Sequence, residues 1–368
     1  EMVSIESQLY KAHPEWVIAI PGRQASVSKH QYILDLSRQD VREYLYRTLS
    51  ELFRLAQVDY IKWDFNRTFS DLYSSNAEIR HYGEFLHRYT LGLYELLEKL
   101  THAFPQVLFE TTRFDLGMLC YMSQAEVSKT TDVLARLAIQ ESSSFAYPLS
   151  TISATVTAGA NHQSLRSSDL ESAFNVAAFG SLGYSIDLGR LKRTEREMIR
   201  SQIAFYKGYR AILQYGVFTR VQLISEGENQ IIWAVASADK QTLLVLFAQR
   251  VATINPPLDT LRIKAVDTNI VYEVFPRQQR LDMQLLGELT KHLSPLPTTE
   301  GGIVQETISK AISLDSEVEH YRASGEQIAY KGIKLNPQYN GTGFDAMTRS
   351  IGDMGSRIYL FKAVDPTA

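Results

Sequence analysis

The sequence has 368 residues, of which 45% are hydrophobic and 21% are charged, a composition typical of globular proteins rather than of disordered or fibrous chains. At roughly 150 residues per domain, this length predicts about two domains. The formal net charge of −3 at pH 7 gives no basic footprint for nucleic acid. Cys120 is the only cysteine, and no stretch approaches the roughly 20 apolar residues of a membrane span. We therefore expect a cytoplasmic protein with no disulfide, metal or cofactor and no membrane partner.

The N-terminal part alternates predicted helices with predicted strands. Apolar side chains at three- and four-residue spacing predict an amphipathic helix over residues 39–57, and a strand follows at 58–64. The next predicted elements are a helix near 78–103, strands at 106–110 and 125–128, a helix at 131–140, an extended segment at 145–156, a strand at 181–187 and a helix at 190–213. This order indicates a parallel α/β sheet or barrel.

The C-terminal part changes to short runs of alternating apolar and polar residues. Strands are predicted at 216–224, 230–238, 242–249, 261–266, 270–275 and 356–364. Such a series is typical of an antiparallel β-sandwich. We therefore predict an α/β domain over residues 1–214 and an antiparallel β-sandwich over residues 215–368.

Residues 60–67, YIKWDFNR, place two opposite charges, Lys62 and Asp64, at the end of a predicted strand. Ionised groups are costly in a core unless they are paired or used. The loops after the strands form the active-site face of α/β barrels, so Asp64 is a candidate catalytic carboxylate. The alternative is an aspartate that caps the next loop or pairs with a nearby lysine. Trp63 is predicted on the opposite face of the strand, packed against helices.

Five segments, in this order, resemble the retaining α-galactosidases and raffinose-type enzymes of glycoside hydrolase family 36. They are YIKWDFNR, RFDLGMLCYM, YPLSTIS, NHQSLR and KLNPQYNGTGFD. The resemblance implies a partial (β/α)8 TIM-type barrel, about strands 4 to 8, followed by the antiparallel β-sandwich. It also implies a carbohydrate ligand, an α-galactoside such as melibiose or raffinose.

The resemblance gives roles to individual residues. It implies that Asp64 is the nucleophile and that Lys62 binds galactose hydroxyl groups. It also places Lys29, Asn66 and Arg113 on the substrate, with Lys29 standing where the family has an arginine. A lysine cannot reproduce the planar, two-pronged donor of an arginine.

The second carboxyl group is the weak point of the resemblance. A retaining glycosidase needs an acid/base carboxyl about 5 to 5.5 Å from the nucleophile. Lys129 stands at that position, and a cation would repel the positive charge that develops on the sugar. Asp132 is expected to cap the following helix rather than to donate a proton. Glu126 stands where the family has a tryptophan. It lies three residues before Lys129, so the two side chains are expected on opposite faces of the strand.

Three hypotheses remain open. The chain is an impaired α-galactosidase that needs a second chain or an N-terminal part to complete the barrel, because residues 1–10 match a segment after the third barrel strand. Alternatively, it is a non-catalytic carbohydrate-binding relative in which Lys129 pairs with Asp64. The third hypothesis is a purely structural relative or fragment. Family relatives that are tetramers make a homo-oligomer an expectation as well.

Overall fold

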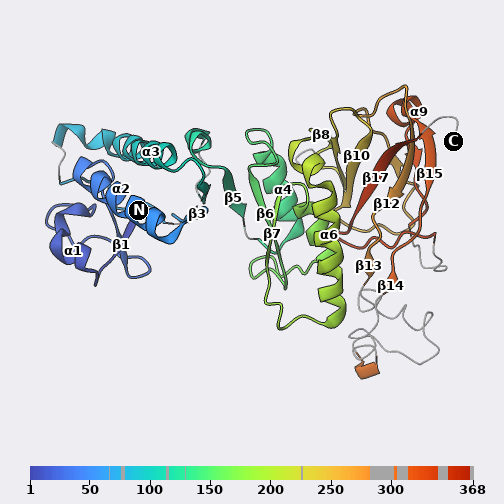
Figure 1. The fold of residues 1–368 in the computed structure, drawn as a ribbon. Helices are drawn as coiled ribbons and strands as arrows, with labels where there is room; N and C mark the ends of the chain where they lie inside the picture. Colours follow the sequence, from blue (N-terminus) through green and yellow to red (C-terminus); the bar gives the residue numbers. More distant parts are fainter. Residues whose placement is uncertain are drawn as a thin grey trace. The chain divides into compact units, whose positions relative to one another are not determined.

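A computed structural model gives the fold of the chain (Figure 1). The structure describes residues 1–65, 67–75, 79–112, 116–128, 130–224, 227–281, 302–304, 314–338 and 347–364. Two compact units form, residues 1–127 and 128–368, and each is described by itself. The predicted division at residue 214 stays a prediction.

The first unit alternates short strands and helices. Its elements are β1 (Met2–Ser4), α1 (Gln8–Ala12), η1 (Pro14–Trp16), β2 (Gln31–Ile33), α2 (Gln39–Ala56), β3 (Tyr60–Trp63), η2 (Ile79–Glu84), α3 (Phe85–Ala103), β4 (Leu108–Thr111), η3 (Leu116–Cys120) and β5 (Gln124–Ser128). β3 pairs with β4, and β4 with β5, both in parallel. Parallel neighbours need a long crossover connection, and α3 supplies the one between β3 and β4.

The apolar stripes predicted from the sequence form the core of this unit. α2 buries Val41 and Phe53, and α3 buries a longer row that includes Leu93 and Leu96. These side chains share one hydrophobic cluster with Phe109 of β4. The predicted helix near 78–103 begins as the 3-10 helix η2 and becomes α-helical at Phe85. The core therefore covers one face of the parallel strands and leaves their other face to polar residues.

The second unit begins with α/β elements and continues into an antiparallel sheet. The α/β elements are α4 (Val133–Ser143), β6 (Ile152–Thr157), α5 (Leu170–Ala177), β7 (Ser181–Ser185) and α6 (Arg193–Tyr215). β6 pairs in parallel with β7. Tyr206 of α6 is buried and donates its hydroxyl to the Gly180 carbonyl at 2.7 Å, which fixes the helix beside β7.

The antiparallel part is built on one large sheet with a smaller layer against it. Its elements are β8 (Val217–Gln222), β9 (Gln230–Ala236), β10 (Thr242–Gln249), β11 (Thr260–Leu261), β12 (Val271–Pro276), β13 (Arg280–Leu281), β14 (Leu314–Asp315), β15 (Tyr321–Ser324), α9 (Gly325–Tyr330), β16 (Ile333–Lys334) and β17 (Ser356–Val364). The large sheet has the order β15-β12-β17-β10-β9-β8. One of its faces shares a buried cluster with Leu261 of β11, Ile328 of α9 and Ile333 of β16. Two apolar layers packed in this way form a sandwich.

Several elements differ from the sequence-based expectation. The predicted strand at 261–266 is reduced to β11, which ends at Leu261. Helix α5 was not predicted; it is eight residues long, and its polar residues Glu171, Ser172 and Asn175 are buried together with its apolar ones. The extended segment predicted at 145–156 contains turns up to residue 151 and becomes β6 only at Ile152. Short elements such as β1, α1, β2, β15 and α9 were not predicted. The other predicted strands and helices of the described residues are present within a few residues of their expected bounds.

Candidate active site

Strand β3 separates its side chains into a polar face and a buried face. Tyr60 and Lys62 are exposed within the first unit, whereas Trp63 is 9% exposed. Trp63 lies in the hydrophobic cluster with Tyr89 and Leu93 of α3, so the predicted packing against helices is confirmed. Its Nε1 donates to a carboxylate oxygen of Glu1 at 2.8 Å. This anchored tryptophan fixes which face Lys62 presents.

Lys62 lies between two buried carboxylates from the neighbouring strands. Its Nζ contacts Oε2 of Glu126 on β5 and lies 3.7 Å from Oε1 of Glu110 on β4. The side chains of Glu110 and Glu126 are 9% and 8% exposed, and that of Lys62 is 34% exposed. Tyr60 donates its hydroxyl to the other oxygen of Glu110. Burial, and then this hydrogen bond, raise the pKa of the Tyr60 hydroxyl, which keeps it protonated as a donor.

Asp64 follows directly after the last residue of β3 and is exposed in the first unit. The register pairs Trp63 with Thr111, and Thr111 with Ala125, so the next row of the sheet contains Asp64, Thr112 and Glu126. The amide of the following residue, Phe65, donates to Oγ1 of Thr112 at 2.9 Å. The backbone beside Asp64 is thus held to the end of β4. Alternation along the strand places Asp64 and Lys62 on the same face.

The loop after Asp64 braces the segment that carries Lys29. Lys29 and His30 have positive φ angles of 51° and 58° and form a tight turn at which Ser28 pairs with Gln31. Arg67 donates to the Gln31 carbonyl at 2.6 Å and also to the Ser26 carbonyl. These bonds tie the turn with the exposed Lys29 to the loop that follows Asp64.

The other predicted site residues cannot be placed. Asn66, Arg113 and Lys129 lie outside the described residues, and so does Asp115 beside Arg113. The roles predicted for all six site residues therefore stay predictions; Lys62 lies on the polar face of β3, and Asp64 follows the last residue of that strand.

Asp132 caps a helix, as the sequence predicts. It is the N-cap of α4, and its Oδ1 accepts the amides of Leu134 at 2.9 Å and Ala135 at 3.2 Å. Its Oδ2 accepts from Ser164 and pairs with Arg166 at 2.6 Å. Burial would raise the pKa of this carboxyl, but the hydrogen bonds from Ser164 and Arg166 outweigh it and hold the pKa below its usual range. Asp132 is therefore suited to capping rather than to proton donation.

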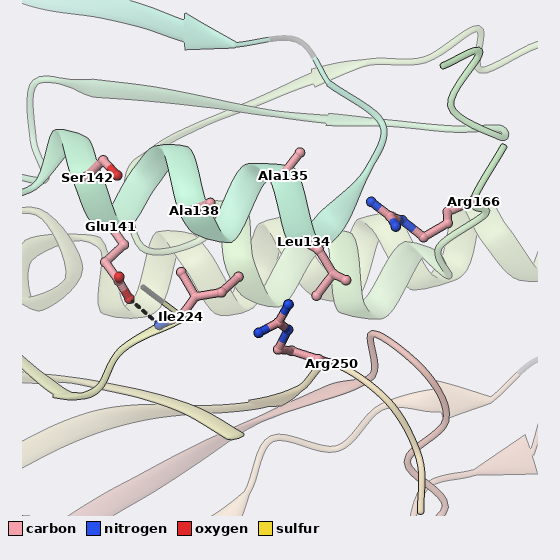
Figure 2. A pocket seen from close by; sticks show the side chains of 8 residues that line it. All are labelled: Leu134, Ala135, Ala138, Glu141, Ser142, Arg166, Ile224 and Arg250. Atoms are coloured by element: carbon pink, nitrogen blue, oxygen red, sulfur yellow. Dashed lines mark hydrogen bonds between the residues drawn. The ribbon is translucent and has the colours of Figure 1, made fainter. Parts of the chain in front are cut away.

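A pocket of about 370 Å³ lies in the second unit, over the exposed side of α4 (Figure 2). Apolar side chains such as Leu134 and Ile224 line it together with Arg166 and Arg250. Glu141 accepts the Ile224 amide at 2.9 Å and so fastens α4 to the segment after β8. The lining includes none of the six predicted site residues, so this pocket carries no part of the candidate active site.

The candidate site contains more charged residues than the sequence-based interpretation assigned to it. Glu110 and Tyr60 were not proposed, and Glu126 was not expected to contact Lys62. The available signal was the alternation of polar residues along three parallel strands, at Tyr60 and Lys62 of β3, Glu110 of β4, and Glu126 of β5.

Within the described residues, no group of three or more His, Cys, Asp or Glu side chains could hold a metal ion. Among all the residues that the structure describes, no helix has both the length and the apolar composition of a membrane span.

Comparisons with known proteins agree with the architecture. The Melibiase family model matches residues 1–216, and the model of the glycosyl hydrolase family 36 C-terminal domain matches residues 230–361. Alpha-galactosidase AgaA of Geobacillus stearothermophilus is 41% identical over 279 residues, 74% of this chain and 38% of that protein. Alpha-galactosidase 1 of Pediococcus pentosaceus is 40% identical over 278 residues, again 74% of this chain and 38% of that protein.

Solved structures extend the likeness to the fold of almost the whole chain. A variant of AgaA from Geobacillus stearothermophilus in complex with raffinose has a TM-score of 0.79 and 34% identity, covering 99% of this chain and 44% of that chain. The alpha-galactosidase from Lactobacillus brevis has the same TM-score and coverage at 30% identity. These neighbours confirm the predicted fold class, a partial barrel followed by a β-sandwich. The chain spans 38% of the length of the curated relatives, and it belongs to the melibiase family, glycoside hydrolase family 36.

Proposed function

We propose that this chain forms the galactoside-binding half of an α-galactosidase-like site, and that its hydrolytic activity is impaired. The supporting observation is the row of polar residues at the carboxyl end of β3, where Lys62 and Asp64 share a face and Trp63 is anchored behind them. This is the end of a parallel strand at which α/β barrels place their catalytic groups. α-Galactosides such as melibiose and raffinose are the proposed ligands.

Asp64 is the proposed nucleophile. An exposed carboxylate at a strand end can attack the anomeric carbon of the sugar and form a glycosyl-enzyme ester, while the bond to the leaving oxygen breaks. Lys62, together with Lys29, Asn66 and Arg113, is proposed to bind the sugar. The fixed backbone at Phe65 supports this role, because it limits the positions that the carboxylate of Asp64 can reach.

The acid/base position, which serves both steps of the reaction, is where activity is impaired. The leaving oxygen needs a proton, and the ester needs a base that deprotonates water. Lys129 stands where the family resemblance puts that acid/base carboxyl. An ammonium there repels the positive charge of an oxocarbenium-like transition state, so both half-reactions lose their assistance.

Five parallel strands, β3 to β7, belong to the part of the chain that the structure describes. A closed barrel of this type has eight, so we propose that polypeptide outside residues 1–368 supplies the remaining three. A separate partner chain and an N-terminal part are both compatible with this proposal.

The test compares hydrolysis of p-nitrophenyl α-galactoside by the wild-type chain and by Lys129→Asp. We expect very slow turnover by the wild type and an increase of about 100-fold in the variant, the usual contribution of a positioned acid/base group. Lys129→Asn is the matched control, because it removes the cation without supplying a carboxyl. Rapid turnover by the wild type would refute the impairment.

The alternative is a non-catalytic carbohydrate-binding relative. The observation that favours it is the ion pair between Lys62 and Glu126. The hydrolytic role requires the same lysine to bind the sugar. Binding of galactose without turnover by either the wild type or Lys129→Asp would support this alternative.

A further inference from the structure

The two residues beside Asp64 are buried in one hydrophobic cluster, although Asp64 itself is exposed within the first unit. Trp63 is 9% exposed and Phe65 is 6% exposed. Successive side chains of an extended chain point to opposite faces, so both neighbours leave the backbone on the side away from Asp64. The backbone position of Asp64 therefore depends on what holds these two aromatic residues.

The carboxylate of Glu1 joins Trp63 to helix α3. Its Oε1 accepts the indole N–H of Trp63 at 2.8 Å, and its Oε2 accepts the hydroxyl of Tyr89 at 2.8 Å. Tyr89 belongs to α3 and is fully buried. The backbone of Glu1 is held as well, because the amide of Leu34 donates to its carbonyl at 2.9 Å. Hydrogen bonds to an ionised acceptor are stronger than those between neutral groups, so this bridge is a firm support for Trp63.

Aromatic contacts join Phe65 to the same residue of α3. The ring centre of Phe65 lies 5.4 Å from that of Phe69, and the ring of Phe69 meets the ring of Tyr89 edge-on at 4.9 Å. Both separations lie in the range of favourable aromatic pairs. Tyr89 thus supports both neighbours of Asp64, Trp63 through a carboxylate and Phe65 through a phenyl ring.

We propose that Glu1 and Tyr89 are positioning residues for Asp64. Acting through Trp63 and Phe65, they fix the backbone from which the carboxylate attacks the anomeric carbon. This inference rests on the proposed function, because it takes Asp64 as the nucleophile. A misplacement of about 1 Å can slow a reaction about 100-fold, so even a small loosening of this support should reduce the rate of attack.

The test follows formation of a covalent adduct between Asp64 and an activated 2-deoxy-2-fluoro-galactoside by mass spectrometry. Tyr89→Phe removes the hydroxyl and keeps the ring. We expect the maximal rate of adduct formation to fall about tenfold, whereas the concentration of sugar at half-maximal rate should change by less than about twofold, because the contacts with the sugar are intact. Tyr46→Phe, the same change at a partly buried position of α2, is the matched control and should alter neither value.

Substitutions of Glu1 provide a graded series. Glu1→Gln replaces one of the two acceptor oxygens by an NH2 donor, and Glu1→Ala removes both acceptors. We expect adduct formation to slow in that order. The indole N–H of Trp63, observed by NMR, should exchange with solvent faster in the same order, which reports the support directly.

Equal maximal rates of adduct formation in the wild type, Tyr89→Phe and both Glu1 variants would overturn the proposal. A fall in rate that only matches the fraction of unfolded protein, measured by urea unfolding of the same samples, would also overturn it. A purely structural role for Glu1 and Tyr89 predicts that second result.

Failure of the proposed function is distinguishable from failure of this inference. If the folded wild type forms no adduct at Asp64, the proposed function is refuted and the positioning role falls with it. If the wild type and the variants form the adduct equally fast, the proposed function stands and the positioning role alone is wrong.

Discussion

Replacing Arg277 by methionine would leave a carboxylate buried without its counter-ion inside the second unit. Arg277, just after β12, contacts Oε2 of Glu171 on α5, and the two side chains are 4% and 5% exposed. The guanidinium also donates to Oδ1 of Asn175 at 3.1 Å and lies 4.8 Å from the ring centre of Phe174. The pair therefore links the antiparallel sheet to a helix of the α/β part of this unit.

The expected cost follows from the burial of the pair. Removing one partner of a buried ion pair destabilises a protein by about 3 to 5 kcal/mol, because the other charge is left uncompensated. Both side chains are at least 95% buried, so solvent offers little screening of the remaining charge. Glu171 keeps the Gln202 amide at 2.9 Å and the Arg280 amide at 3.1 Å, which places Arg277→Met near the lower end of that range.

Urea unfolding followed by tryptophan fluorescence, to which Trp233, a buried residue of β9 in the same unit, contributes together with Trp16 and Trp63 of the first unit, measures this cost. We expect Arg277→Met to lose about 3 kcal/mol. In Arg277→Met with Glu171→Gln no charge remains at the pair, so the double variant should be about 1 to 2 kcal/mol more stable than Arg277→Met alone. A loss below about 1 kcal/mol in the single variant, or a double variant less stable than the single one, would refute the reasoning.

Three further changes test the local structure. Asp132→Ala removes the N-cap of α4 and should cost about 1 to 2 kcal/mol of unfolding free energy at pH 7. Because the folded pKa of Asp132 is lowered, its contribution is present above about pH 4 and is lost as the pH falls through the folded pKa, so the loss of stability between pH 7 and pH 3 in urea titrations should be smaller in the variant than in the wild type. Arg67→Met removes the hydrogen bonds to the carbonyls of Gln31 and Ser26 and should accelerate amide hydrogen exchange in residues 26–31. Unchanged exchange would show that these bonds do not hold the turn in place. Gly92→Ala would place a Cβ 2.0 Å from a backbone oxygen and should cost about 1 to 3 kcal/mol, whereas Gly83→Ala, which has open space around it, should change stability by less than about 0.5 kcal/mol.

Helical periodicity and short apolar runs were sufficient to predict most elements, because the amphipathic helices have one buried and one exposed face and strands such as β9 and β10 are apolar and buried on both faces. α2 shows this clearly, since Val41 and Phe53 are buried on the stripe that the spacing defines. α5 escaped prediction because it is short, at eight residues, and its polar residues Glu171, Ser172 and Asn175 are buried with its apolar ones. β11 is shorter than predicted, because the residues after Leu261 leave the ladder although their side chains still alternate.

The predicted position of Asp64 at the end of a strand depended on local sequence alone, and the structure places it after the last residue of β3. The partners of Lys62 could not be predicted in this way. Lys62 and Glu126 meet only because β3, β4 and β5 pair in a particular register, and the register of parallel strands is set by packing of the helices between them. The backbone conformation of Lys29 could not be predicted either, because a φ of 51° is not expected for a lysine.

The central claim is that the carboxylate of Asp64 faces a galactose-binding site. An activated 2-deoxy-2-fluoro-galactoside tests this position, because its leaving group needs no acid assistance. Only the attack by the nucleophile is needed to form the covalent adduct, and hydrolysis of the adduct is not. We predict a covalent adduct on the peptide that contains Asp64, identified by mass spectrometry, and its disappearance in Asp64→Asn or in the presence of excess galactose. Absence of labelling in the folded wild type, or labelling at another residue, would contradict the claim.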